Sequence, residues 1–243
     1  MTVLAVVVFV SLQFVEAGYG KFKNKKWGFS IKNKIGWFLM ETPVFIAMFL
    51  LWLFSERGFE ITPLIIYVIF MSHYFHRAFI FPFRLKGKNT MPVAIVLMGV
   101  SFNMLNAFMQ AGWLFYFAPS DMYSVSWLYS PQFIAGFIIF VAGMFVNISS
   151  DSIIRNLRKE GDNNYYLPKG GMFNYVVSAN YFGEFLEWVG FALLSWSWAA
   201  VVFAVWTFAN LAPRAKSTYR KYSLLFGDEF HRKKLKYIIP FIY

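Results

Sequence analysis

Polar and charged side chains stand inside several long apolar segments of this chain. A charged side chain at the centre of a lipid bilayer costs about 2.5–3.5 kcal/mol on insertion scales, so such residues usually face a protein interior or a cavity. Glu41, close to Pro43, is one of them. A buried carboxyl group must find a partner or take up a proton. A protonated Glu41 is a hydrogen-bond donor, and it is therefore a candidate for polarising a carbonyl group of a ligand.

Other polar residues recur at helical intervals. Residues three or four apart lie on one face of a helix. The intervals predict three polar stripes: Asn103–Asn106–Gln110, Asn147–Asp151 and Asn180–Glu184–Glu187. The alternative for any single amide is a hydrogen bond between helices that only stabilises a bundle.

A cluster of ring and cationic side chains occurs at 73–77. His73 and His76 are three residues apart, but neither a matched acid nor a third histidine accompanies them, so we expect no metal site. We expect His76 and Arg77 to satisfy polar neighbours instead.

The chain has no Cys, which excludes thiolate catalysis and Cys-based metal centres.

Basic residues flank the apolar segments and predict a site for phosphate groups. Arg155 and Arg158 are three apart and lie near Asp151, and a Pro168–Lys169–Gly170–Gly171 turn follows. Such a basic set suits a di- or triphosphorylated ligand. Anionic lipid head groups are the alternative, and for the Lys run at 21–34 we favour lipid. The sequence contains neither a P-loop nor a G-x-G-x-x-G motif, so a nucleotide site here is not of the soluble type.

The composition indicates the elements that position these residues. Of 243 residues, 58% are hydrophobic and 14% charged, which excludes disordered chains and ordinary soluble domains. A spanning helix needs roughly 20 apolar residues. We predict an all-α, seven-transmembrane-helix bundle that forms one domain over 1–243. The predicted spans are Thr2–Ala17, Ile35–Ser55, Pro63–Phe83, Met91–Phe117, Gln132–Ser150, Asn174–Leu194 and Trp196–Ala212.

The charge distribution predicts the orientation. The loops 18–34, 84–90 and 151–173 carry +6, +3 and +1, and the tail from Pro213 carries +6. The loops 56–62 and 118–131 carry −1 each. Because positive loops stay in the cytoplasm, we expect the N-terminus outside and the C-terminus in the cytoplasm. The first span lacks a basic leader and a cleavage site, so we expect it to be retained.

The motifs resemble those of the steroid 5α-reductases over nearly the whole chain. The C-terminal half contains Leu167-Pro-Lys-Gly-Gly171, Ser178-Ala-Asn180 and Gly183-Glu184-Phe-Leu-Glu187-Trp188. That pattern marks a broad superfamily, which includes sterol reductases and, more loosely, isoprenylcysteine methyltransferases. Three N-terminal elements narrow the resemblance to the 5α-reductases: Gly18-Tyr-Gly-Lys21, Met40-Glu41-Thr-Pro43 and His73-Tyr74-Phe-His76-Arg77.

The resemblance implies an NADPH-dependent reductase of the Δ4 bond in 3-oxo steroids. It assigns Glu41 and Tyr74 to the 3-keto oxygen, as the catalytic residues. It places most of the cofactor site in the C-terminal half, 132–243. The cofactor residues that it implies are Lys21, Lys88, Asn147, Asp151, Arg155, Arg158, Tyr165, Asn180, Glu184, Arg214 and Tyr222.

The sequence departs from the family's motifs in three places. Met40 stands where the family has Gln, Thr218 where it has His, and the 84–90 loop carries Leu85 and Lys88 in place of Asn and Arg.

Three alternative functions stay open: an S-adenosylmethionine-dependent methyltransferase of the isoprenylcysteine type, a reductase of another lipid enone, and a seven-helix receptor or transporter. A methyltransferase would need neither Glu41 with Tyr74 nor cations for cofactor phosphates.

The expected partners are a steroid or sterol-like substrate and membrane lipids. We expect no nucleic acid and no obligate protein partner. The lack of Cys and the short tails are compatible with a bacterial homologue in the inner membrane, and the endoplasmic reticulum is the alternative membrane. In both cases we expect the cofactor site to face the cytoplasm.

Overall fold

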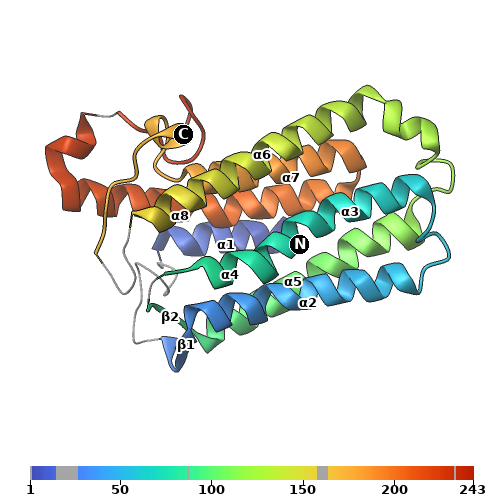
Figure 1. Cartoon of the computed structure of the whole chain (residues 1–243), viewed down its shortest axis with the longest axis horizontal. Helices are drawn as coiled ribbons and strands as arrows, with labels where there is room; N and C mark the ends of the chain where they lie inside the picture. Colours follow the sequence, from blue (N-terminus) through green and yellow to red (C-terminus); the bar gives the residue numbers. More distant parts are fainter. Residues whose placement is uncertain (1, 15–26, 87, 158–163, 233) are drawn as a thin grey trace.

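The fold is a bundle of helices that run alternately up and down beside one another (Figure 1). The computed structural model describes residues 2–14, 27–86, 88–157, 164–232 and 234–243. The α-helices are α1 Thr2–Phe14, α2 Asn33–Leu53, α3 Ile61–Phe75, α4 Phe81–Arg84, α5 Val93–Ala111, α6 Pro131–Asn156, α7 Ala179–Ser195 and α8 Trp198–His231. Two π-helical turns, His76–Ile80 and Gly112–Phe117, extend α3 and α5, and short 3-10 helices lie at Val125–Tyr129 and Gly171–Asn174.

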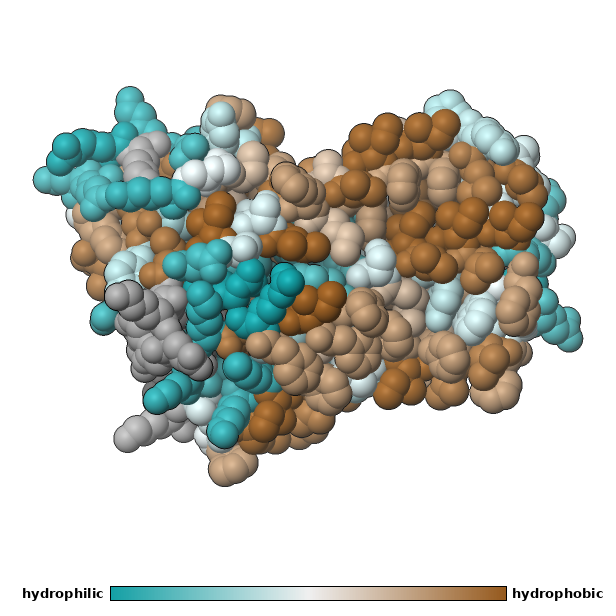
Figure 2. Space-filling model, viewed as in Figure 1, coloured by the Kyte–Doolittle hydropathy of each residue, from teal (hydrophilic) through white to brown (hydrophobic). Residues whose placement is uncertain are grey.

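The two ends of the bundle differ in character. At one end, β1 (Ser30–Lys32) pairs antiparallel with β2 (Thr90–Pro92), and the C-terminal residues lie close to the start of α7. We call this the basic end, because the segments that meet there carry cations: Lys32 on β1, Lys86 and Lys88 just before β2, and Arg232, Lys234 and Lys236 near the C-terminus. Figure 2 shows hydrophilic side chains gathered mainly at this end and hydrophobic ones over the body of the helices.

Four of the helical segments are long and apolar enough to cross a membrane. They are Asn33–Leu53, Ile61–Arg84, Val93–Phe117 and Pro131–Asn156. Among the described residues, α1 has 13 residues and α7 has 17, and α8 continues well beyond its apolar part. A helical chain with several candidate membrane spans is therefore confirmed.

Two predicted spans have the wrong boundaries. The helix predicted over Asn174–Leu194 begins only at Ala179, because the backbone just before it pairs with the C-terminal segment instead: Val177 N–H donates to Lys236 O at 2.9 Å and Lys236 N–H to Tyr175 O at 3.0 Å. The helix that contains the span predicted over Trp196–Ala212 begins at Trp198 and continues past Ala212 to His231, with a kink at Gly227, whose φ of 47° and ψ of −123° are not helical. Pro213 removes only one backbone hydrogen bond, and buried packing on both sides keeps α8 helical.

Smaller differences occur at other helix ends. The helix of the fifth predicted span continues beyond Ser150 to Asn156, so Arg155 lies on α6. Met91, predicted to open the fourth span, belongs to β2, because its backbone pairs with Ile31. The last part of the first predicted span, residues 15–17, lies outside the described residues.

Helices α6 and α7 approach each other closely through four glycines. A Cβ atom on Gly143 would collide with the backbone nitrogen of Glu187, and one on Gly183 with the backbone nitrogen of Asn147. Gly136, seven residues before Gly143, and Gly190, seven residues after Gly183, are related in the same way. Small residues let helix backbones pack at short range in membranes. This contact places Asn147 of α6 beside Gly183 of α7, one residue before Glu184.

We expect Gly143→Val to destabilise the protein by roughly 1–3 kcal/mol, because the added side chain must push two backbones apart. The matched control is Ala142→Val on the exposed face of the same helix, with an expected change within about 0.5 kcal/mol. Thermal denaturation in detergent measures both. Equal losses for the two variants would contradict the close helix contact.

Candidate functional site

A buried group of polar side chains lies between α2, α3 and α5. Glu41 is 8% exposed and Tyr74 2%, and the amides of Asn103, Asn106 and Gln110 are buried with them. The predicted amide stripe on α5 is confirmed, since all three of its members face this interior. We call these five residues the Glu41–Tyr74 cluster.

Hydrogen bonds fix the orientation of the cluster. Asn103 Nδ2 donates to Glu41 Oε2 at 3.1 Å and to the backbone oxygen of Met40 at 2.8 Å. Asn106 Nδ2 donates to Tyr74 Oη at 3.1 Å. Gln110 Nε2 donates to Asn106 Oδ1 at 3.1 Å, which turns the amide nitrogen of Asn106 towards the tyrosine. Two adjacent turns of α5 therefore hold the two predicted catalytic side chains.

The hydroxyl of Tyr74 accepts a hydrogen bond and keeps its proton available. Among the described residues, none is seen to accept that proton, so it can be donated to a ligand. Accepting a hydrogen bond polarises an O–H group and strengthens it as a donor. The ring is held by Phe70 at 4.8 Å and Trp188 at 5.9 Å between ring centroids. Tyr74 is thus a fixed donor inside an apolar wall.

A second buried network centres on Arg77. Its guanidinium donates to Asp151 Oδ2 at 3.3 Å and to Glu184 Oε2 at 3.4 Å. Asn180 Nδ2 donates to Asp151 Oδ1 at 3.0 Å, and Asn147 Nδ2 donates to the Asn180 backbone oxygen at 2.9 Å. We call these five residues the Arg77 network. It joins four of the predicted cofactor residues into one unit across α6 and α7.

Arg77 is placed by a π-helical turn. The turn His76–Ile80 follows α3 directly, and such turns occur often at functional sites. The guanidinium carbon lies 4.6 Å from the centre of the Phe81 ring and 5.0 Å from that of Trp37. Cation–π contacts of this kind stabilise a cation that has left water. The expectation that Arg77 satisfies polar neighbours is confirmed.

The two groups of residues are neighbours. Glu41 interacts electrostatically with Arg77 and Glu184, and Tyr74 interacts with all three. The Glu41–Tyr74 cluster on α2, α3 and α5 therefore faces the Arg77 network on α6 and α7. A ligand carbonyl at Tyr74 and a second ligand at Asn180 and Glu184 would lie close together.

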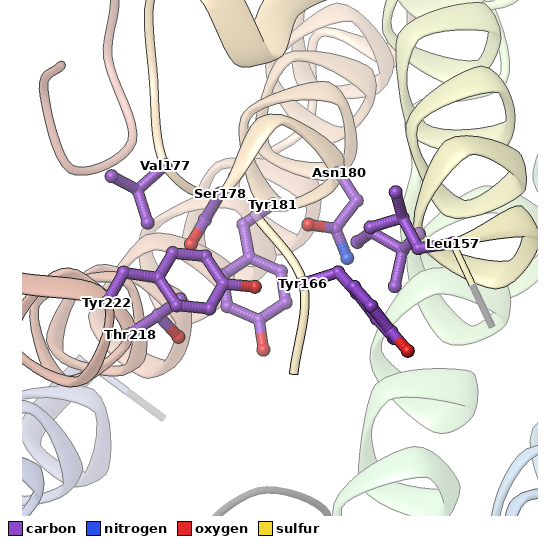
Figure 3. A pocket seen from close by; sticks show the side chains of 9 residues that line it. Leu157, Tyr166, Val177, Ser178, Asn180, Tyr181, Thr218 and Tyr222 are labelled. Atoms are coloured by element: carbon purple, nitrogen blue, oxygen red, sulfur yellow. The ribbon is translucent and has the colours of Figure 1, made fainter. Parts of the chain in front are cut away.

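A pocket opens at the basic end beside the Arg77 network (Figure 3). Its cavity volume is about 80 Å³, and it is partly open to solvent. Asn180 lies between its Leu157 and Tyr181 walls, and Tyr222 and Thr218 enter from α8 (Figure 3). The lining residues are Ile154, Leu157, Tyr166, Val177, Ser178, Asn180, Tyr181, Thr218 and Tyr222.

The pocket suits part of a dinucleotide. Three tyrosine rings offer faces for a flat base, and Asn180, Ser178 and Thr218 offer hydrogen-bonding groups. Close to it, Lys221 Nζ lies 4.2 Å from the centre of the Tyr165 ring. Gly170 and Gly171 have φ angles of 90° and 52°, so their backbone adopts a turn that other residues rarely enter. The lining itself is aromatic and polar, and Lys221 is a nearby cation that could meet a phosphate group.

Nine of the eleven predicted cofactor residues lie in the described part of the chain. Asn147, Asp151, Asn180 and Glu184 belong to the Arg77 network, and Tyr222 lines the pocket together with Asn180. The other four are placed less centrally: Arg155 donates to Ser152 at 2.9 Å, the Tyr165 ring lies 4.2 Å from Lys221 Nζ, Lys88 is exposed, and Arg214 is half-buried on α8. Lys21 and Arg158 lie outside the described residues.

Sequence reasoning missed part of this arrangement. It did not foresee that Arg77 joins Asp151 to Glu184, nor that His73 Nδ1 lies 2.8 Å from Glu187 Oε1. The helical spacing of Asn180, Glu184 and Glu187 was a signal for the second of these contacts, because it places Glu187 on the polar face of α7 that is turned towards α3. Within the described residues, no group of three or more His, Asp or Glu side chains is arranged to hold a metal ion.

Comparison with known proteins identifies relatives over the whole chain. The family model described as 3-oxo-5-alpha-steroid 4-dehydrogenase matches residues 89–243. A steroid 5-alpha-reductase of Gossypium hirsutum is 38% identical over 245 aligned residues, covering 99% of this chain and 94% of the relative. The 3-oxo-5-alpha-steroid 4-dehydrogenase 1 of Mus musculus is 37% identical, covering 98% and 92% of the two chains.

Proposed function

Because the chain belongs to the 3-oxo-5-alpha-steroid 4-dehydrogenase family, the steroid 5-alpha-reductases, we propose that it reduces the Δ4 bond of 3-oxo-Δ4 steroids with NADPH. The observation that supports this most directly is the Tyr74 hydroxyl, which is buried, oriented by Asn106 and free to donate its proton. An enone carbonyl is a ligand that such a donor would polarise.

In the proposed reaction, Tyr74 donates a hydrogen bond to the oxygen on carbon 3. Polarising this carbonyl makes the conjugated carbon 5 electrophilic. The bound cofactor would supply the hydride that adds there. Negative charge then develops on the steroid oxygen, where a preorganised donor lowers the barrier. Glu41 would support Tyr74 from α2, and a proton added at carbon 4 completes the saturated 3-oxo product.

The cofactor would be held by α6, α7 and α8. We assign Asn180 and Glu184 to the nicotinamide end, because they adjoin the Glu41–Tyr74 cluster through Arg77. Tyr165, Tyr222, Arg155 and Arg214 would contact the nucleotide further towards the basic end. The less central phosphate contacts that we propose are Lys21, Lys88 and Arg158, and Asn147 and Asp151 would hold Asn180 in place.

We further propose that seven helices span the membrane as a single domain over 1–243. In this arrangement α1, α7 and the first part of α8 are the spans beyond the four long apolar segments. The N-terminus is outside, and the basic end, with the pocket, faces the cytoplasm. The alternation of the loops between the two ends of the bundle supports it (Figure 1).

Purified protein tests the activity directly. With NADPH and testosterone or progesterone, we expect the 5α-reduced 3-oxo steroid as product, identified by mass spectrometry against both 5-epimers. Absence of product from folded protein would contradict steroid reduction. If the protein instead reduces a lipid enone that is not a steroid, the alternative of a reductase for another lipid enone would be favoured.

We expect NADPH to stabilise the protein and S-adenosylmethionine to leave it unchanged. A ligand that binds only the folded state adds about 2.7 kcal/mol at 100 times its Kd. A thermal-shift titration with both cofactors measures this, with NADH as the control for the 2′-phosphate. A shift with S-adenosylmethionine alone would favour the methyltransferase alternative.

A further inference from the structure

One buried pair of titratable side chains takes no part in the proposed reaction. His73 of α3 and Glu187 of α7 meet at 2.8 Å, Nδ1 to Oε1, and are 5% and 0% exposed. The other carboxyl oxygen of Glu187 has no hydrogen-bond partner among the described residues. The histidine is thus the polar contact that holds this carboxyl group. Burying such a group is costly, so its presence calls for a role.

The pair lies directly against the side chains that hold Tyr74. The His73 ring meets the Trp188 ring edge-on at 4.5 Å and the Tyr74 ring at 5.0 Å. Trp188 follows Glu187 in the chain and also packs on Phe70, the second ring beside Tyr74. His73 and Glu187 themselves are shielded from a ligand. Any effect they have on the reaction acts through Trp188 and Tyr74.

The pair also joins the two sides of the site. Tyr74 follows His73 on α3 and belongs to the side that would hold the steroid carbonyl. Asn180, Glu184 and Glu187 form one stripe on α7, and the first two would hold the cofactor. A hydrogen bond between His73 and Glu187 therefore fixes α3 relative to the stripe that carries the cofactor contacts. Rates of transfer between two ligands depend steeply on such distances.

We propose that His73 and Glu187 are positioning residues that set the distance between the steroid carbonyl site and the cofactor site. This inference rests on the proposed function. It assigns the pair a geometric role: the hydrogen bond is required, and the negative charge of the carboxylate is not.

The first test separates geometry from charge. Glutamine at 187 presents both a donor and an acceptor, so it can pair with either tautomer of His73. We expect Glu187→Gln to keep kcat within about threefold, and Glu187→Leu and His73→Phe to lower it about 10–100-fold. The KM values for steroid and NADPH should stay within about threefold, since the pair touches neither ligand. The double variant should lose no more than either single variant, because both remove the same bond.

The second test does not depend on activity. The chain has no native cysteine, so spin labels can be placed on exposed positions through Phe75→Cys at the end of α3 and Trp196→Cys at the C-terminal cap of α7. We expect the distance distribution between the labels to broaden in Glu187→Leu and to match the unsubstituted protein in Glu187→Gln. If the leucine variant does not fold, the Glu187→Leu, His73→Phe double variant, which buries no unpaired polar group, takes its place.

Three results would overturn the inference. One is a kcat of Glu187→Gln as low as that of Glu187→Leu, which would show that charge matters. Another is a change confined to KM, and the last is an unchanged label distribution in Glu187→Leu. Failure of the unsubstituted protein to reduce any steroid would instead sink the proposed function, and the spin-label result would still decide whether the pair fixes α3 against α7.

Discussion

Replacing Tyr74 with phenylalanine is expected to lower steroid turnover about 10²–10³-fold, as for loss of one donor to a developing oxyanion. The variant removes the proton that we assign to the steroid oxygen and leaves the ring packing of Phe70 and Trp188 in place. NADPH affinity should be unchanged, because the cofactor contacts lie on other helices. Steady-state kinetics and an NADPH thermal shift measure the two quantities.

Tyr67→Phe is the matched control. Tyr67 lies on the same helix, is buried, and stacks on Trp52 at 5.3 Å. Its hydroxyl makes no hydrogen bond within the described part of the chain, so its loss should change turnover little.

Glu41→Gln should resemble Tyr74→Phe in lowering kcat rather than cofactor affinity. Equal losses of turnover and NADPH binding in either catalytic variant would refute the assigned roles.

Arg77→Met is expected to have the largest effect on stability. It leaves the carboxylates of Asp151 and Glu184 buried without their cation, and breaking a buried pair in this way costs about 3–5 kcal/mol. Methionine keeps much of the side-chain volume against Trp37 and Phe81, so the loss reports charge rather than packing. Thermal denaturation in detergent should show the loss, together with weaker NADPH binding.

The comparison is Arg57→Met at the opposite end of the bundle. Arg57 pairs with Glu60, which is 45% exposed, and such surface ion pairs contribute about 0–1 kcal/mol. A further variant combines Arg77→Met with Asp151→Asn and Glu184→Gln and should regain part of the stability. If Arg57→Met destabilises as much as Arg77→Met, the central role of the buried network is wrong.

Periodicity predicted a good part of the arrangement. Asn103, Asn106 and Gln110 were expected on one face, and all three are buried side by side on α5. That prediction succeeds because the 3.6-residue turn of a helix is a local property that spacing alone reveals. The resemblance to the steroid 5α-reductases, rather than the spacing, placed Asp151 and Asn180 in one site, and the two side chains are hydrogen bonded.

Contacts between helices could not be predicted in the same way. The pairing of His73 with Glu187 and of Arg77 with Asp151 depends on how α3 is rotated against α6 and α7, and no local spacing encodes that angle. The late start of α7 is another example: residues 175–177 do not join the helix because their backbone pairs with Lys236, about sixty residues away in the chain. Similarly, α8 continues through Pro213, a residue type that usually ends a helix, because tertiary packing on both sides keeps the backbone helical.

The pairing of residues 175–178 with 236–237 has a consequence for the making of the protein. Lys236 and Tyr237 are translated after every described helix, yet their backbone bonds hold the start of α7, where Ser178 and Asn180 line the pocket. Helices α6 and α7 can pack as soon as both have left the ribosome, since domains form progressively during synthesis. The wall of the pocket next to α7 is completed only at the last step, so a ribosome that stops before codon 236 releases a bundle with helices in place and an unfinished pocket.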